Sequence, residues 1–128
     1  MSVSDSPAMP EPANMCPVVS EVDKNIKEAA GHYNPIWFYN QVRNKGPWDY
    51  KQQGSQYQDF GNFNYGATGS AMGFPNFVLL RMAGWAQQHA GTSKSDWGSP
   101  LGRAPYGDDP DDQAQVKAGM EYARCKCK

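Results

Sequence analysis

Apolar residues near the start of the folded part of the chain recur at intervals of three or four positions, the spacing of one helix face. These positions are Val18, Val22, Ile26, Ala29 and Tyr33. Residues 20–23 add a capping-like start with early negative charge, and Gly31 marks the break after this helix. Asn34 and Pro35 then have the pattern of a cap followed by proline at the first helical position, which predicts a second helix that Gly46 and Pro47 terminate.

The middle of the chain has two segments without a clear amphipathic period. Residues 48–58 alternate aromatic, charged and amide side chains around Gly54, which predicts an ordered loop. Residues 59–73 hold so many small side chains that a neighbouring backbone could approach closely, although each glycine inside a helix costs roughly 1 kcal/mol relative to alanine. A helix over this segment therefore requires tight packing to offset that cost.

Two further helices are predicted towards the C-terminus. Pro75 begins a helix that runs through Gln88 and is closed by Gly91. Its expected core face consists of Val78, Leu79, Met82, Ala83 and Ala86. After a long irregular connection over residues 92–107, the acidic run around Pro110 caps a last helix that carries basic residues towards its end.

These elements predict an all-α, compact single-domain bundle of about four to five helices with long irregular loops. Residues 1–17 contain four prolines among polar residues and are expected to form a flexible arm ahead of a folded domain over residues 18–128. The longest apolar stretch, residues 74–86, is interrupted by polar residues, so we expect a soluble protein that does not bind membranes. The first residues also lack the basic and apolar segments of a secretory signal.

Charge and cysteine content limit the possible functions. With 12 Lys+Arg against 13 Asp+Glu the net charge is −1, so no global positive field attracts nucleic acid or an anionic membrane, and any such binding has to be local. Cys16, Cys125 and Cys127 occur without an export signal, which favours reduced thiols. A zinc site at the Cys-x-Cys pair would lack the usual ligand spacing, so we expect no metal and no other cofactor.

Four blocks of sequence carry a resemblance to a known family. They are Trp37 to Lys51 (WFYNQVRNKGPWDYK), Phe60 to Gly69 (FGNFNYGATG), Leu79 to Gln87 (LLRMAGWAQ) and Tyr106 to Gln113 (YGDDPDDQ). Through these blocks, in this order, the chain resembles the bacterial polymorphic toxin type 44 domain from about Ile36 to Tyr122.

The resemblance implies an antibacterial effector with a secretion-system carrier, a cognate immunity protein and an enzymatic attack on nucleic acid. Together with the missing signal, it implies synthesis in the bacterial cytoplasm and delivery into a target cell by a Sec-independent secretion system.

The leading functional hypothesis is a metal-independent nuclease that acts on RNA. Arg43, Asp49, Lys51 and Asp59 combine cations with carboxylates. RNA cleavage needs a base for the ribose 2′-hydroxyl, here Asp49 or Asp59, and cations for the charge that builds on phosphate oxygens, here Arg43 and Lys51. The same spacing also suits a surface ion pair near a helix end.

Substrate-binding residues are expected in the glycine-rich block and in the acidic run. Asn62, Asn64 and Tyr65 could hydrogen-bond a phosphate or a base, or could simply cage a helix end. The aspartates around Pro110 suit helix capping, and Asp112 is the one retained as a possible site residue.

A second hypothesis is a peptidoglycan-cleaving toxin, in which an acid and a second carboxylate flank a glycosidic bond. The aromatic residues Trp48, Tyr50 and Tyr57 would then stack on sugars. Balanced charge suits this hypothesis better than a nuclease, whose candidate cations would have to converge into a basic groove. These cations are Arg43, Lys45, Lys51 and Arg81. A third hypothesis is a non-catalytic binding module.

Overall fold

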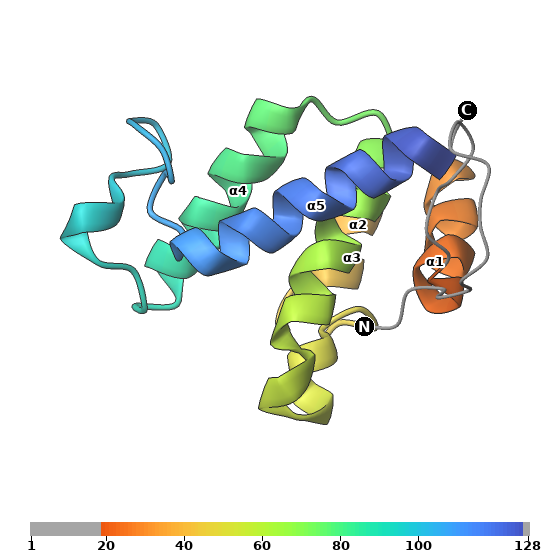
Figure 1. The fold of residues 1–128 in the computed structure, drawn as a ribbon, viewed down its shortest axis with the longest axis horizontal. Coiled ribbons are helices and arrows are strands. Elements are labelled where there is room, and N and C mark those ends of the chain that lie inside the picture. The colour runs from red at the N-terminus through yellow and green to blue at the C-terminus, as the bar shows by residue number, and fades with distance from the viewer. Residues whose placement is uncertain (1–18, 127–128) are drawn as a thin grey trace, which may run out of the picture.

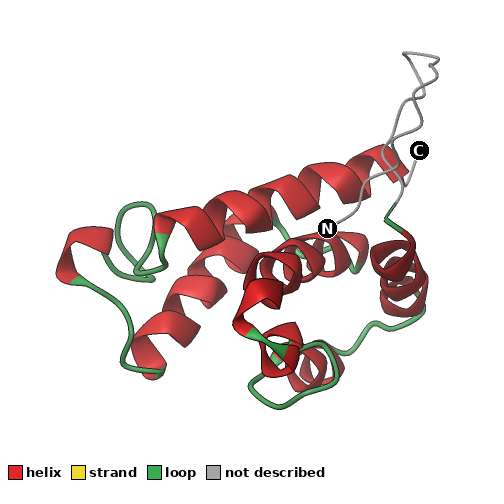
Figure 2. Ribbon diagram, turned by 60° about the horizontal axis from the view of Figure 1, so that its bottom comes forward, coloured by secondary structure: helices red, strands yellow, loops and turns green. Residues whose placement is uncertain are grey.

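The structure, a computed structural model, describes residues 19–126, so the expected arm over residues 1–17 lies outside the described residues. The described residues form five α-helices, which are labelled in Figure 1, and Figure 2 shows only helices and loops among them. The helices are α1 (Ser20–Ala30), α2 (Pro35–Val42), α3 (Gln58–Ala71), α4 (Asn76–His89) and α5 (Pro110–Lys126). Short 3-10 turns occur at Tyr50–Gln53, Ser55–Tyr57 and Ser95–Trp97. The all-α prediction is confirmed.

Helix α5 lies across α3 at the centre of the fold (Figure 1). Helix α1 packs against α3, near the C-terminal end of α5. One core cluster joins α2, α4 and α5 around Phe38, Leu79 and Met120. A second cluster joins α1, α3 and α5 around Val22 and Phe63. None of the described helices has the length and apolar character that a membrane span requires.

The first helix starts differently from the predicted cap. Its N-cap is Val19, which has no capping side chain, and the backbone N–H of Val19 donates to the Tyr122 hydroxyl at 2.9 Å. The same hydroxyl donates to the carboxylate of Asp23. Helix α1 is therefore capped by a side chain from α5, a long-range contact that local sequence does not reveal.

The second helix has the predicted start and an earlier end. The Asn34 side chain accepts a hydrogen bond from the Ile36 N–H at 2.9 Å, and Pro35 occupies the first helical position. The helix ends at Val42, and the chain then folds back so that Trp48 N–H donates to the Gln41 carbonyl at 2.8 Å. A Cβ on Gly46 would lie 2.7 Å from that same carbonyl oxygen, so only glycine permits this return.

The glycine-rich segment forms helix α3, and its small residues allow α5 to approach closely. A Cβ on Gly66 would lie 2.0 Å from the Val116 carbonyl oxygen, and a Cβ on Gly119 would lie 2.0 Å from the Phe63 carbonyl oxygen. The two backbones therefore touch where the helices cross. This contact confirms the prediction that tight packing would compensate for the poor helix propensity of the segment.

The predicted core face of α4 is only partly correct. Leu79 is buried as expected, but the other buried residues are Leu80 and Gly84, while Ala86 is exposed. A Cβ on Gly84 would lie 1.8 Å from the Tyr106 carbonyl oxygen, so the connection before α5 covers this side of the helix. The helical period could not predict this face, because part of it is covered by irregular chain rather than by another helix.

The expectation of reduced thiols is wrong for Cys125, which is disulfide-bonded. That expectation rested on the odd number of cysteines and the missing export signal. Neither of these shows which thiols the fold brings together.

Candidate functional site

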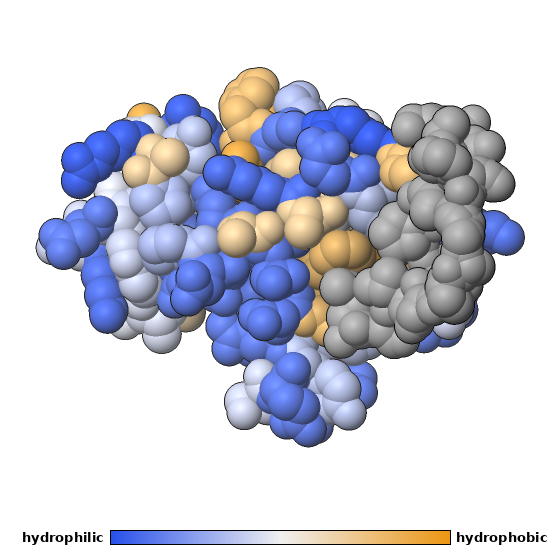
Figure 3. Space-filling view, in the orientation of Figure 1, coloured by the Kyte–Doolittle hydropathy of each residue, from blue (hydrophilic) through white to orange (hydrophobic). Residues whose placement is uncertain are grey.

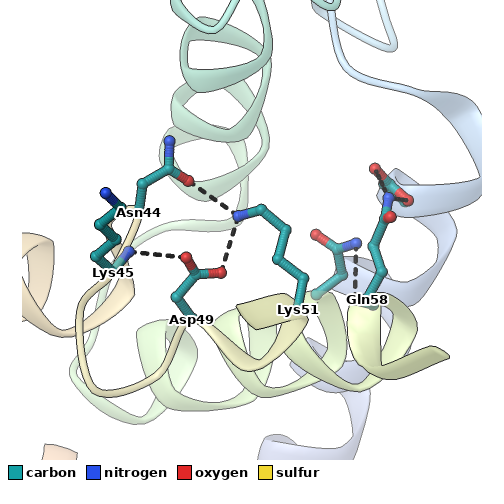
Figure 4. Close-up of polar contacts among 7 residues, drawn as sticks. Asn44, Lys45, Asp49, Lys51 and Gln58 are labelled. Atoms are coloured by element: carbon teal, nitrogen blue, oxygen red, sulfur yellow. Dashed lines mark hydrogen bonds and ion pairs between the residues drawn. The ribbon is translucent and has the colours of Figure 1, made fainter. Parts of the chain in front are cut away.

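A row of polar side chains lies along the turn that follows α2 (Figure 4). Asp49 accepts two hydrogen bonds of 2.8 Å, one from the Lys45 backbone N–H and one from Lys51 Nζ. Lys51 Nζ also donates to Asn44 Oδ1 at 2.9 Å. Lys45 has a φ of 69°, a left-handed conformation that the carboxylate helps to hold. Figure 4 shows the Lys51 side chain reaching back between Asn44 and Asp49.

The Asp49 carboxylate is suited to hold Lys51 rather than to move protons. Its side chain is only 3% exposed, against 48% for Lys51. Burial alone would raise the pKa of Asp49, but the hydrogen bonds from Lys51 and from the Lys45 backbone, with the lysine charge, outweigh it and bring the pKa below 3.8. The carboxylate therefore stays ionised near neutral pH and has little affinity for a proton.

The row continues across the start of α3 to the start of α5. Gln58 Nε2 donates to both carboxylate oxygens of Asp112 at 3.0 Å, and Asn62 Nδ2 donates to the Gln58 carbonyl at 3.2 Å. Burial raises the pKa of Asp112 above 3.8, and the negative charges of Asp109, Asp59 and Asp111 raise it further against the hydrogen bond from Gln58. We call this set the polar row. Its members are Asn44, Lys45, Asp49, Lys51, Gln58, Asn62 and Asp112.

The same segments also line an open cleft of about 800 Å³. Its lining residues are Glu21, Tyr50, Gln53, Gln56, Tyr57, Asp59, Phe60 and Gln115. Tyr50 and Asp59 lie in the cleft, whereas their chain neighbours Lys51 and Gln58 lie in the polar row. The lining contains two carboxylates, three amides and three aromatic rings, and it contains no lysine or arginine. We call it the acidic cleft. The projection that carries its 3-10 turns is largely hydrophilic (Figures 1 and 3).

Buried polar contacts hold one wall of the acidic cleft. The Tyr50 hydroxyl donates to Glu21 Oε2 at 2.9 Å and accepts from Asn25 Nδ2 at 2.8 Å. Asn25 Nδ2 also donates to Asn64 Oδ1 at 2.9 Å. Burial raises the pKa of the Tyr50 hydroxyl to about 12, and the neighbouring Glu21 adds to the rise. Tyr50 therefore stays protonated and fixes the Glu21 carboxylate in the cleft.

A second buried polar group lies between α3, α4 and α5. The Tyr65 hydroxyl donates to the Leu79 carbonyl at 2.7 Å. Asp108 accepts from the Asp109 N–H and from Gln113 Nε2, both at 2.9 Å, and it is only 3% exposed. Burial raises the pKa of Asp108 to about 6. The Asp109 side chain accepts from the Asp111 N–H at 2.8 Å, so the acidic run does cap α5 as predicted.

The predicted site residues separate into three groups. Asp49, Lys51, Asn62 and Asp112 belong to the polar row, and Asp59 lines the acidic cleft. The remaining four lie elsewhere. Asn64 and Trp48 are buried in the core, Tyr65 bonds to the α4 backbone, and Arg43 lies 5.8 Å from the ring centroid of Tyr39.

The four candidate cations do not form one groove. Arg81 lies 4.5 Å from the Tyr106 ring centroid and donates to the Pro100 carbonyl at 2.8 Å, whereas Lys51 is paired with Asp49. Sequence reasoning also missed residues of the cleft. Glu21 lies in α1, far from the resembling blocks, and only the density of glutamines around Gly54 hinted at Gln53 and Gln56.

Fold and site together define a small α-helical domain with an acidic, amide-rich cleft at the start of α3. No group of three or more His, Cys, Asp or Glu side chains within residues 19–126 is arranged to hold a metal ion. Neither a curated protein nor a solved structure matches the chain.

A family profile does match. The chain belongs to the bacterial toxin 44 family, whose profile matches residues 23–124. It is therefore a bacterial toxin domain, and membership of such a family implies delivery to target cells and, in general, an immunity partner.

Proposed function

We propose that this toxin domain cleaves the glycan strands of the bacterial cell wall. The observation that carries the proposal is the lining of the acidic cleft, which combines carboxylates, amides and aromatic rings without any lysine or arginine. Sugar hydroxyls are bound by carboxylates and amides, and sugar rings stack on aromatic side chains. A nucleic acid would instead meet two carboxylates in the cleft, and phosphate contacts by cations dominate nucleic-acid affinity.

Two carboxyl groups would share the chemistry. Glycoside hydrolysis needs an acid that protonates the leaving oxygen and a second carboxylate that activates water or attacks the sugar. Asp112 lies outside the cleft lining, in the polar row, where Gln58 joins it to the start of α3. It suits the acid, because burial raises its pKa and keeps its proton to a higher pH. Asp59 is exposed in the cleft and suits the second role. The charge of Asp59 contributes to the raised pKa of Asp112, which supports a common site.

The test is digestion of purified cell-wall sacculi. The wild-type domain is expected to release new reducing ends, while the Asp59→Asn and Asp112→Asn variants lose at least about a hundredfold in rate. Asp96→Asn is the matched control, because Asp96 is exposed in the Ser95–Trp97 turn, lines no part of the cleft and does not contribute to the raised pKa of Asp112. Equal activity of all three variants would remove these carboxyls from the mechanism.

Ribonuclease activity stays the alternative, and the exposed Lys51 in the polar row favours it, since its ammonium could contact a phosphate. The two activities differ in the compartment where the toxin kills. A wall enzyme is lethal only when it is directed to the periplasm, whereas a ribonuclease is lethal in the cytoplasm and degrades purified RNA. Death from cytoplasmic expression with intact sacculi would refute the glycan proposal.

Delivery and protection complete the proposal. Family membership supports delivery of the toxin into a target cell by a secretion-system carrier and its neutralisation by a cognate immunity protein. If the toxin attacks the wall, that immunity protein has to act in the periplasm. Co-expression of the toxin with an immunity protein confined to either compartment tests this location.

A further inference from the structure

Lys51 presents an ammonium group that Asp49 and Asn44 hold in the polar row, on the segment that adjoins the acidic cleft. Among the lysines of residues 19–126, Lys51 is the one whose side-chain nitrogen hydrogen-bonds to residues of the polar row. Lys45 contributes only its backbone N–H, and the Lys45 side chain points away from Asp49 (Figure 4). Lys51 directly follows Tyr50, a lining residue of the cleft. A ligand that extends from the cleft along this segment would reach one cation, which lies in the polar row.

The hydrogen bonds of Lys51 leave room for a ligand. An ammonium group has three donors, and Asp49 and Asn44 accept two of them. The side chain is 48% exposed, so the third donor is open to an incoming anion. Holding a half-exposed lysine in this way adds little to stability, because surface ion pairs are weak. Its rotamers are instead fixed before any ligand arrives, which lowers the entropy cost of binding.

We propose that Lys51 binds a carboxylate of the stem peptide on the wall glycan, so that the toxin selects strands whose stem peptides carry free carboxylates over strands whose stem peptides are amidated. The inference rests on the proposed function. A glycan strand with its peptides carries carboxylates, and the Glu21 and Asp59 carboxylates of the cleft repel them. The neighbouring ammonium group of Lys51 is the place where such a carboxylate can pair.

The experiment compares two forms of one substrate. Sacculi are stripped of teichoic acid, which removes phosphate as a competing anion, and in half of the material the stem-peptide carboxylates are converted to neutral amides with a carbodiimide and ammonia. The release of reducing ends from both forms gives a rate ratio. Wild type is expected to prefer the form with free carboxylates, and Lys51→Gln should lower the rate ratio about tenfold, as for the loss of one hydrogen bond to a charged group.

Two further variants separate charge recognition from damage to the fold. Lys51→Arg keeps the positive charge and should keep most of the preference. Lys45→Gln removes the same charge from the same turn but keeps the backbone N–H that binds Asp49, so its ratio should equal that of wild type.

The outcomes distinguish this inference from the proposed function. If both wild type and Lys51→Gln cleave the glycan with the same rate ratio between the two forms of the substrate, the role of Lys51 is refuted and the proposed function stays intact. A wild-type domain that cleaves neither form overturns both.

Discussion

The close crossing of α3 and α5 predicts that one glycine-to-alanine change weakens the fold while another in the same helix strengthens it. An alanine Cβ at Gly66 would lie 2.0 Å from the Val116 carbonyl oxygen and 2.8 Å from its carbonyl carbon. Both atoms belong to the backbone, so no side-chain rotation relieves the clash and α5 has to move away. At Gly61 the nearest atom is Tyr50 Cβ at 3.7 Å, an ordinary contact.

The magnitudes follow from two opposing effects. Alanine improves helix propensity by about 1 kcal/mol at either position. Overpacking costs about 1–3 kcal/mol or more, and Gly66 lies at the upper end because two backbones have to separate. We therefore expect Gly66→Ala to lower the free energy of unfolding by about 2 kcal/mol and Gly61→Ala to raise it by about 0.5–1 kcal/mol.

Urea unfolding followed by circular dichroism measures both changes, provided that the slope with denaturant stays constant. Gly66→Ala should also lose activity, because moving α5 separates Gln58 from Asp112. A Gly66→Ala protein as stable as Gly61→Ala would show that the helices do not touch as described.

Three other changes test the buried polar groups. Burial raises the pKa of Asp108 from 3.8 to about 6, so the wild-type protein should lose stability as pH rises through this range. Asp108→Asn should abolish this loss, and urea melts at about pH 8 should show it to be more stable than wild type. The side-chain oxygen of Gln113, which has no hydrogen-bond partner, would then accept from the new amide. Asp49→Ala should cost about 1–3 kcal/mol in thermal unfolding, because the Lys45 backbone N–H loses its buried, charged acceptor; an unchanged melting temperature would contradict this. Tyr65→Phe should cost about 1 kcal/mol by losing the bond to the Leu79 carbonyl, and an equal unfolding midpoint would argue against that bond.

Local signals in the sequence predicted the helices well. The break at Gly31, the Asn34 cap with Pro35 and the left-handed Gly91 after α4 all depend on a few neighbouring residues. The need for close packing of α3 also followed from glycine content alone. Where a helix end depends on a distant residue, as Val19 does on Tyr122, the sequence predicted the helix but not its cap.

The candidate site was predictable only in part. Residue type and spacing identified Asp49, Lys51 and Asp112. They could not show that the pKa of Asp49 is lowered and that of Asp112 raised, because these shifts depend on what surrounds each carboxyl in the fold. Asn64 was expected to bind a substrate, yet it faces Asn25 in the core, because the helical phase of α3 turns it towards α1. The cleft combines α1, α3 and α5, and no local pattern shows that these helices meet.

The bond between Val19 and Tyr122 joins positions 103 residues apart, so the domain closes upon itself only when its last helix is present. A chain emerging from a ribosome or a transport channel cannot form this contact until Tyr122 has passed. Fragments that stop short of Tyr122 should therefore be sensitive to proteases and non-toxic. Toxic activity would then belong only to chains that include the end of α5.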